Sequence, residues 1–448
     1  MSDLLAIGAS GVRAYQTALA TVGENIANVG TAGYTRRTVQ VAEVPGGSGS
    51  VNQYGAGNGV TLTGIARSSD TYSTAALRAS TSDLSRTTKG ATWLDRIDGA
   101  LTGNALTSRM TSFFAASQSL AAEPDSSALR TSMYSAANTL AVSFSATGQA
   151  FDQIDTDLDT AGRQAATDLS SLGTSLAGIN DGLGRAAPGS TAAAQLMDQR
   201  DQILTKMSEQ VDLSVSFDSL GRSTVTLAQS SGAPFVKGNS SGIVSYERDD
   251  NGQATFSQIV DGIATQLTPN GGTIAGITDG AQRVAANRDA LNGLTSSFVK
   301  TVNDNQAAGE DQNGVKGTAI FAVGDSPTDI TLAAGFTDGS KIAAAAPGGG
   351  KRDSSNLSIL EQSRQGKAFE STLSGMITDN GTAYKQKSTI ADAQTAIRDG
   401  AATALSTSTG VNLDSEAVDL MRFQQAYAAS SRVIQVARET MQSILDIR

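Results

Sequence analysis

The sequence contains neither cysteine nor histidine among its 448 residues. Without cysteine the chain has no disulfide and no thiol nucleophile, and without histidine it has no imidazole to act as a general base. Zinc fingers, which need these two residues as ligands, are excluded for the same reason. Any catalysis would therefore rest on paired carboxylates or on serine and lysine.

Aromatic residues are also scarce, at 5%, whereas hydrophobic residues reach 39% and charged residues 17%, proportions that are typical of a globular protein. Alanine, glycine, serine and threonine are abundant instead. Small side chains let helices approach closely, but they bury less apolar surface per residue than large ones. We therefore expect modest stability for the free subunit.

The sequence also has no excess of positive charge and no long apolar run. The 33 Lys and Arg against 43 Asp and Glu give a net charge of −10, and no basic patch is visible, so we predict no nucleic-acid partner. No apolar run approaches the roughly 20 residues that cross a membrane. Arg13 interrupts the only stretch that resembles a signal peptide. We predict no membrane insertion and no cleaved signal peptide.

The C-terminal segment, residues 410–448, carries an apolar repeat with a period of seven. A helix with this period can pack along its whole length against another helix. Asn412 or Asp414 can cap its start. The repeat consists of Leu413, Leu420, Tyr427, Ile434 and Met441, with Phe423, Ser430, Ala437 and Ile444 in the second register.

The N-terminal segment shows the same design and ends at Gly30 and Gly33. Its repeat consists of Leu5, Val12, Leu19 and Ile26, with Gly8, Tyr15, Val22 and Val29 in the second register. We predict that the two ends pair with each other and leave a second surface for neighbouring copies. An amphipathic core helix has a similar pattern over three or four turns, so the period alone leaves that alternative open.

Between the two ends, helical patterns surround one β-rich block. We predict a mainly α fold with a small β-rich insert, in an elongated multi-domain molecule with nested domains built from N- and C-terminal segments. Residues 1–35 with 410–448 would form a terminal coiled-coil domain, 36–211 with 271–409 a long-helix domain with a β-hairpin, and 212–270 a small β-rich outer domain. Within 354–408 we expect short helical pieces, and within 46–59 a loop.

Few residues point to chemistry. Asp152, Asp155, Asp157 and Asp159 follow one helical segment, and we interpret them as a solvated face rather than an acid–base pair. Glu310 and Asp311 begin a loop that lacks the acid spacing of an EF-hand. The glycines at 55–59 predict a turn, and Trp93 predicts a core anchor. We predict no enzyme activity, no cofactor and no metal site.

Two terminal stretches resemble known sequences. ASGVRAYQTALATVGENIANVGTAGYTRR, at residues 9–37, resembles the signature of bacterial flagellar axial proteins. VNLDSEAVDLMRFQQAYAASSRVI, at 411–434, resembles the version found in the FlgK family of hook-associated proteins. Interior stretches such as LMDQRDQILTKMSEQVDL, at 196–213, resemble that family too, so the resemblance covers most of the chain. The family's turn motif corresponds to Asn25, Asn28, Gly33 and Tyr34; Gly30 and Ala32 depart from it.

The resemblance implies a structural subunit of the junction zone between hook and filament, located outside the cell on the bacterial flagellum. It implies export by the flagellar type III system and terminal helices that are disordered in the monomer and form a coiled coil on assembly. The implied partners are further copies of the chain, the hook protein, a second junction protein and an export chaperone. Another axial protein, of hook or distal rod, is one alternative. A secreted binding module or hydrolase built on the β-rich insert is the other.

Overall fold

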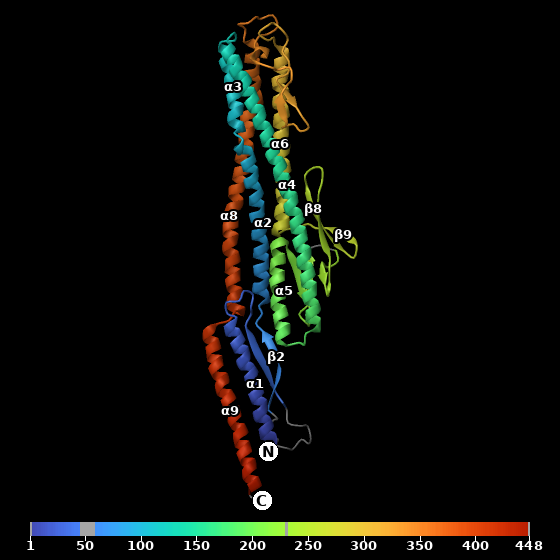
Figure 1. Cartoon of the computed structure of the whole chain (residues 1–448), viewed down its shortest axis with the longest axis vertical. Coiled ribbons are helices and arrows are strands. Elements are labelled where there is room, and N and C mark those ends of the chain that lie inside the picture. The colour runs from blue at the N-terminus through green and yellow to red at the C-terminus, as the bar shows by residue number, and fades with distance from the viewer. Residues whose placement is uncertain (1, 45–58, 229–231, 447–448) are drawn as a thin grey trace.

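The computed structural model describes residues 2–44, 59–228 and 232–446. The described chain is long and narrow, its helices run along its length, and both termini lie at the same end (Figure 1). The helices are α1 (Ser2–Ala27), α2 (Thr71–Gly103), α3 (Leu106–Ala122), α4 (Ser127–Arg185), α5 (Thr191–Gln210), α6 (Gly272–Ala308), α7 (Ser355–Lys367), α8 (Phe369–Thr409) and α9 (Leu413–Asp446), with a short 3-10 helix η1 (Gly339–Lys341). The predicted elongated, mainly α fold with a β-rich insert is confirmed.

The strands form four small antiparallel sheets, ordered β1-β2, β3-β4-β5-β6, β7-β8-β9 and β10-β11. Seven of these strands fall between residues 213 and 266, which is within the range of the predicted insert. The strands are β1 (Arg37–Glu43), β2 (Val60–Arg67), β3 (Leu213–Phe217), β4 (Ser223–Leu227), β5 (Val236–Lys237), β6 (Ser240–Ser241), β7 (Ile243–Arg248), β8 (Ala254–Val260), β9 (Ile263–Gln266), β10 (Phe321–Val323) and β11 (Ile330–Leu332).

Four of the long helices begin at side-chain caps, and at α9 the predicted Asn412 side chain accepts from Ser415 N at 3.1 Å. The Asp70 side chain accepts a hydrogen bond from Ser73 N at 3.0 Å, and Ser190 Oγ accepts one from Ala193 N at 3.1 Å. Ser126 takes the same position before α4. Each cap satisfies a backbone N–H that has no partner inside the helix, which fixes where the helix starts.

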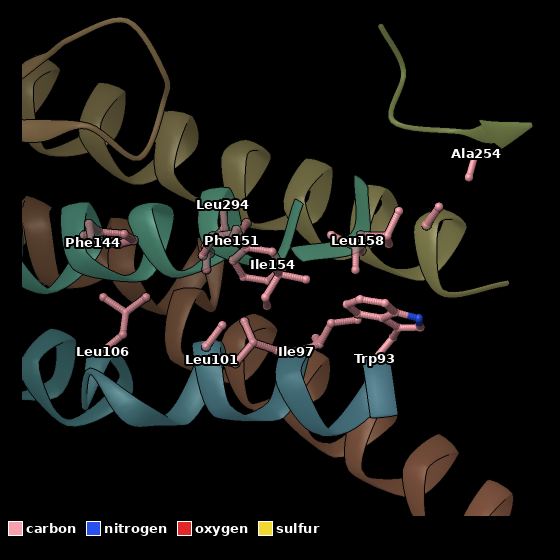
Figure 2. Close-up of a cluster of buried hydrophobic side chains, with 14 of the residues drawn as sticks. Trp93, Ile97, Leu101, Leu106, Phe144, Phe151, Ile154, Leu158, Ala254 and Leu294 are labelled. Atoms are coloured by element: carbon pink, nitrogen blue, oxygen red, sulfur yellow. The ribbon is translucent and has the colours of Figure 1, made fainter. Parts of the chain in front are cut away.

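The core of the helical body lies between α2, α3, α4 and α6. Trp93, Ile97 and Leu101 of α2 point toward Phe151 and Leu158 of α4 (Figure 2). All five side chains are almost completely buried, and Trp93 is the core anchor that the sequence predicted. A single apolar cluster therefore runs along most of the molecule's length.

Aromatic rings close the end of this core that lies away from the termini. The Phe298 ring lies 5.8 Å from Phe113, 5.6 Å from Phe321 and 5.6 Å from Phe369, centroid to centroid. Edge-to-face and tilted pairs at these distances add to the gain from burial alone. Helices α3, α6 and α8 and strand β10 are held together here.

Helix α8 differs from the short pieces predicted for residues 354–408. It runs for 41 residues alongside α2, and only the left-handed Ala368, with φ 50°, separates it from α7. Its serines, threonines and glycines weaken the apolar period in the sequence. The contacts with α2 are polar and close instead: the Asn380 side chain donates to Leu94 O at 2.9 Å, and the Lys387 stem packs on Gly90.

Only part of the acidic face of α4 is the solvated surface that we predicted, because Asp152 is 65% exposed but Asp155 only 15%. Asp155 forms ion pairs with Arg248 of β7 and Arg288 of α6, and Tyr246 donates a hydrogen bond to Asp159 at 2.8 Å. Burial raises the pKa of Asp155, and the hydrogen bond from Arg248 opposes that rise. These carboxylates therefore fasten the β-rich insert and α6 to α4.

The hairpin β1-β2 lies beside α1, and its second strand also reaches α5 (Figure 1). A register shift between Gln40 and Val41 marks a bulge within it. The sequence grouped this hairpin with the long helices, and that domain grouping stays a prediction. The predicted loop at 46–59 and the glycine turn at 55–59 lie outside the described residues, except for Gly59.

Candidate functional site

Helices α1 and α9 lie side by side at the end of the molecule that holds both termini, and they run in opposite directions (Figure 1). Their line of closest approach consists of small residues. A side chain at Gly8 would collide with Ile434, and a side chain at Gly11 would collide with Ser430. Ala18 is buried further along α1. The two helices thus approach through glycine and alanine, and we call this line the terminal seam.

The large apolar residues that the sequence predicted for assembly border the seam rather than form its closest contacts. The Tyr15 and Phe423 rings meet across it, with centroids 6.3 Å apart. Val22 is buried, and the half-buried residues are Leu5, Val12, Tyr15, Leu19, Ile26, Leu420, Phe423 and Ile434. The exposed residues are Leu413, Tyr427, Met441 and Ile444. The role of this set in assembly stays a prediction.

Exposed apolar residues also lie on α9 outside its contact with α1, interspersed with polar residues such as Arg432. Val418, Met421 and Val436 are exposed by 60%, 56% and 59%, and Val433 by 38%. Val418 and Val436 are 18 residues apart, which is five full turns, so they point in the same direction. Contact with α1 therefore leaves these apolar side chains of α9 uncovered within the described part of the chain.

Asn25 joins the turn after α1 to the first turn of α9. Its side chain is fully buried. The amide nitrogen donates to Arg37 O at 2.8 Å and to Glu416 Oε2 at 3.0 Å. The amide oxygen accepts from Tyr34 Oη at 2.9 Å and from Arg37 N at 3.0 Å. Both donors and both acceptor positions of the amide are therefore occupied.

Glu416 is the partner of Asn25 on α9, and its side chain is also fully buried. Arg36 Nε donates to Glu416 Oε1 at 2.6 Å, and the same guanidinium reaches Asp419 at 3.0 Å. The Arg36 backbone N–H donates to Thr409 O, at the end of α8, at 2.9 Å. A buried carboxylate needs a paired charge and hydrogen bonds, and here a segment from the other end of the chain supplies both.

A second charged cluster connects the hairpin to α5. Asp198 Oδ2 lies 3.0 Å from the Arg37 guanidinium, and Asp198 Oδ1 lies 2.6 Å from Arg67 Nε. Thr35 Oγ1 donates to Asp198 at 2.6 Å, and Arg67 reaches Asp201 at 2.5 Å. Together with the Asn25–Glu416 contacts, these bonds make up what we call the joint, between the terminal helices and the helical body.

The turn between α1 and β1 contains the remaining motif residues. Asn28 donates from its side chain to Glu24 O at 2.9 Å and accepts from the Thr31 hydroxyl at 3.2 Å. Gly33 adopts φ +75°, and Gln202 of α5 occupies the space that a side chain there would fill. The structure thus brings all four predicted motif residues into one turn, held against α5 and α9.

Burial and nearby charges shift the pKa values of side chains at the joint, partly in opposite directions. Burial raises the pKa of the Tyr34 hydroxyl; the nearby Arg37 opposes the rise and Glu24 adds to it. Burial lowers the pKa of Arg200, which Asp201 partly offsets. The Arg37 guanidinium also stacks over the Tyr34 ring at 4.6 Å. Tyr34 therefore stays protonated and donates to Asn25 at neutral pH.

The described residues contain no group of three acidic side chains arranged to hold a metal ion. In the loop after α6, Asp311 accepts from the backbone N–H of Asn313 at 2.7 Å and of Val315 at 3.0 Å, so it shapes a turn. None of the described helices is long and apolar enough to pass through a membrane.

Two family models match the chain. The model of the flagellar hook-associated protein FlgK helical domain matches residues 93–321, which is just over half of the chain. The model of the flagellar basal body rod FlgEFG protein C-terminal region matches residues 404–447, and so includes α9.

Two curated relatives are both named flagellar hook-associated protein 1. Flagellar hook-associated protein 1 of Escherichia coli (strain K12) is 28% identical over 363 residues, which cover 77% of this chain and 66% of that protein. The protein of that name from Bacillus subtilis (strain 168) is 22% identical over 498 residues, covering 97% of this chain and 96% of the relative. The chain thus spans slightly less than two thirds of the Escherichia coli protein's length.

One solved structure is also similar, that of the flagellar hook junction protein FlgK from Burkholderia pseudomallei. It is 23% identical with a TM-score of 0.49, and the match covers 55% of this chain and 46% of that one.

Proposed function

Because the chain belongs to the FlgK family of flagellar hook-associated proteins, we propose that it is a structural subunit of the bacterial flagellum. It forms the junction zone between hook and filament, outside the cell, and has no catalytic role. Its partners are further copies of itself, the hook protein on one side, a second junction protein on the other, and an export chaperone before assembly.

The terminal seam is the observation that carries this proposal. It brings the two ends of the chain together, yet it leaves the apolar side chains of Val418, Met421 and Val436 exposed on α9. Exposed apolar side chains that lie close together can mark a protein–protein contact. Neighbouring copies stacked along a tube would cover these side chains. In this account α1 and α9 are the assembly helices, and Leu420, Phe423 and Ile434 of α9 stabilise the contact of α9 with α1.

Export is the second part of the proposal. The subunit leaves the cell through the flagellar type III channel with its terminal helices unpaired, and these helices form on assembly. The small residues of the seam support this order, because a contact through Gly8, Gly11 and Ala18 buries little apolar surface. Isolated helices gain most of their stability from packing, so a weak seam permits unfolding before export.

Deletion of the gene tests the proposal. We expect hooks without filaments in electron micrographs and flagellin released into the medium. A plasmid copy should restore filaments. Copies with Leu420→Asp or Ile434→Asp should not, because a buried charge costs several kcal/mol, on the order of 3–5, at an apolar contact. The thermal unfolding of the purified subunits should hardly change.

Two outcomes would contradict the proposal. Normal filaments on the deletion strain would exclude a junction role. Loss of the hook itself would instead indicate one of the other axial positions, hook or distal rod. Antibody labelling of the complemented strain locates the chain directly and separates these cases.

A further inference from the structure

Most of α8 contributes nothing to the apolar core. Its first turns do, because Phe369 and Leu373 are buried and the Phe369 ring packs on Phe298. The next buried residue is Asn380, and the one after it is Thr409, at the C-terminal end of the helix. The segment 381–408 therefore lies along α2 without one buried residue (Figure 1). We call this segment the strap.

The side of the strap that faces α2 is formed by small and polar residues. From residue 387 onward, half-buried residues recur every three or four positions, a spacing that follows one side of a helix. They are Lys387, Ser388, Ala391, Gln394, Thr395, Arg398, Ala401, Ala402 and Leu405. Leu405 is the only large apolar residue among them, whereas Tyr384, Ile390 and Ile397 are exposed. The contact with α2 thus buries little apolar surface.

Two polar atoms at this contact have no partner. Lys387 packs on Gly90, and because α8 and α2 run in opposite directions, Gln394 of α8 lies level with Ser82 of α2. Gln394 Oε1 and Ser82 Oγ are both buried, and neither has a hydrogen-bond partner in the described chain. A buried polar atom without a partner costs free energy that contact with water recovers. Opening the strap hydrates both atoms, which offsets part of the contact that is lost.

Within the described residues, one ion pair joins the strap to another element. Lys387 Nζ lies 3.6 Å from Asp279 of α6, and the two side chains are 28% and 29% exposed. A partly exposed pair contributes little, because water screens it and both side chains lose freedom. The ends of α8 are held better. The Phe298 ring packs on Phe369 at one end, and the Arg36 backbone N–H donates to Thr409 O at the other.

Helix α6 shows the contrast within the same body. Ile277, Val284, Leu291 and Phe298 follow one another at a spacing of seven, and all are buried in the core cluster. The free energy of local opening rises with buried apolar contacts, so α6 should open only when the body unfolds. The strap lacks such contacts. Its serines, threonines and glycines also favour a helix only weakly, so a strap that leaves α2 unwinds.

We propose that the strap opens from α2 and unwinds as a unit while the helical body stays folded. The first turns of α8 and the joint hold its two ends. As a helix the strap is about 42 Å long, whereas the unwound strap can span about 90 Å. When it is open, only the joint and the terminal seam fix the position of α9. The strap is a property of the chain itself and does not depend on the proposed function.

Hydrogen exchange of the purified chain, measured segment by segment by mass spectrometry without denaturant, tests the proposal. We expect the strap to exchange at least 100-fold faster than residues 277–302 of α6, because its opening exposes backbone N–H groups without unfolding the body. The strap should still exchange at least tenfold slower than an unfolded peptide, because it is closed most of the time. Equal exchange of the strap and α6 would overturn the proposal, and so would exchange of the strap at the rate of an unfolded peptide.

Glycine substitutions separate local from global opening. Ala396→Gly with Ala404→Gly changes exposed positions of the strap, so it lowers helix propensity without removing a contact with α2. Each glycine should speed exchange within the strap about fivefold, and the midpoint of thermal unfolding should not change. The matched control, Ala286→Gly with Ala290→Gly, changes exposed alanines of α6. It should lower the midpoint and leave the exchange of the strap as it is.

The opposite outcome for the strap variant decides against the proposal. If Ala396→Gly with Ala404→Gly lowers the midpoint of thermal unfolding as much as the α6 control, the strap opens only together with the body.

A substitution on the side that faces α2 should close the strap more tightly. Gln394→Leu removes a buried oxygen that has no partner and adds apolar surface toward α2. We expect exchange within the strap to slow about tenfold. Gln386→Leu makes the same change at an exposed position of the strap and should leave the exchange within about twofold of the wild type. Equal effects of the two leucines would show that the contact with α2 does not set the stability of the strap.

Discussion

The two ends of the molecule are both helical, but they are built from different side chains. At the end away from the termini, rings such as Phe113, Phe298 and Phe369 pack in one cluster. At the terminal end, Gly8 and Gly11 bring two backbones together. Burying one large side chain contributes about 1.5–3 kcal/mol, whereas a glycine contributes close approach and almost no apolar area. The helical body, from α2 to α8, should therefore fold alone. The terminal helices α1 and α9 should need contacts with neighbouring copies to be stable.

The joint lies between these two regions and differs from both. It holds α9 to the rest of the chain through the buried side chains of Asn25 and Glu416, and it holds the hairpin to α5 through Asp198. Buried polar bonds add little net stability, but their loss is expensive, and they admit only one geometry. The joint can therefore fix the direction of the terminal helices even where the seam is weak.

The largest expected effect is in the body. Phe298→Ala should lower the free energy of unfolding by about 3–5 kcal/mol, because it removes a ring that five other rings contact. Thermal unfolding of the purified chain measures it. Val142→Ala, at a residue that is 60% exposed, is the control and should change the free energy by less than about 0.5 kcal/mol. Equal effects of the two substitutions would contradict the division drawn here.

The next largest effect is expected at the joint, on the stability of the contact between α9 and the rest of the chain. Asn25→Ala removes the hydrogen bonds to Glu416 Oε2 and from the Tyr34 hydroxyl, although Arg36 still binds Glu416 Oε1. Each buried polar atom left unpaired costs about 1–3 kcal/mol. We expect faster proteolysis of α9 in the monomer, with the unfolding temperature of the body unchanged. Asn28→Ala, in the same turn but half-buried, is the control. An unfolding transition of the whole chain that moves down with Asn25→Ala would show that the joint is part of the core.

A smaller effect separates two glycines of α1. Gly8→Ala places a methyl group against Ile434, whereas Gly23 has open space around it. Alanine favours a helix over glycine by up to about 1 kcal/mol, so Gly23→Ala should raise the helix content of the free chain. Gly8→Ala should lower filament attachment in spite of the same propensity gain. Identical behaviour of the two variants would mean that the seam is not formed in the flagellum.

The smallest effect on the free chain is expected on the outer side of α9. Val436→Ser should leave the monomer's free energy of unfolding within about 0.5 kcal/mol, because the residue is exposed. It should nevertheless reduce filament attachment if neighbouring copies cover this side. Gln424→Ser, at an exposed polar position about 120° around the same helix, is the comparison. Full attachment with Val436→Ser would leave that apolar side without a role in assembly.

Much of the helical body could be predicted because local signals agree with one another. Asp70 and Ser190 stand where helices start, and Pro124 separates two of them. In the β-rich insert, strict alternation and the turn at Gly252 marked the strands. Helix α8 could not be predicted, because its serines, threonines and glycines read as interruptions. Its length is set by α2, which runs beside it and is remote in sequence.

The terminal seam and the joint could be predicted only in part. The seven-residue period located both helices, but it favoured the largest side chains, whereas the line of closest approach follows Gly8 and Gly11. The turn motif around Asn25 was found through resemblance. The contact of Arg37 with Asp198 could not be found, because nothing local marks charges that lie 161 residues apart as neighbours. The only local signal of this cluster is the pair Asp198 and Asp201, which lie on one side of a predicted helix.

Hydrogen exchange of the wild-type chain, measured before and after assembly, tests the central claim most directly. In the dilute monomer we predict that the amides of α1 and α9 exchange orders of magnitude faster than those of α4 and α6. In isolated flagella all four helices should be protected alike. Equal protection of α9 and α6 in the monomer would contradict the account, since the ends of the chain would then be stable without neighbours.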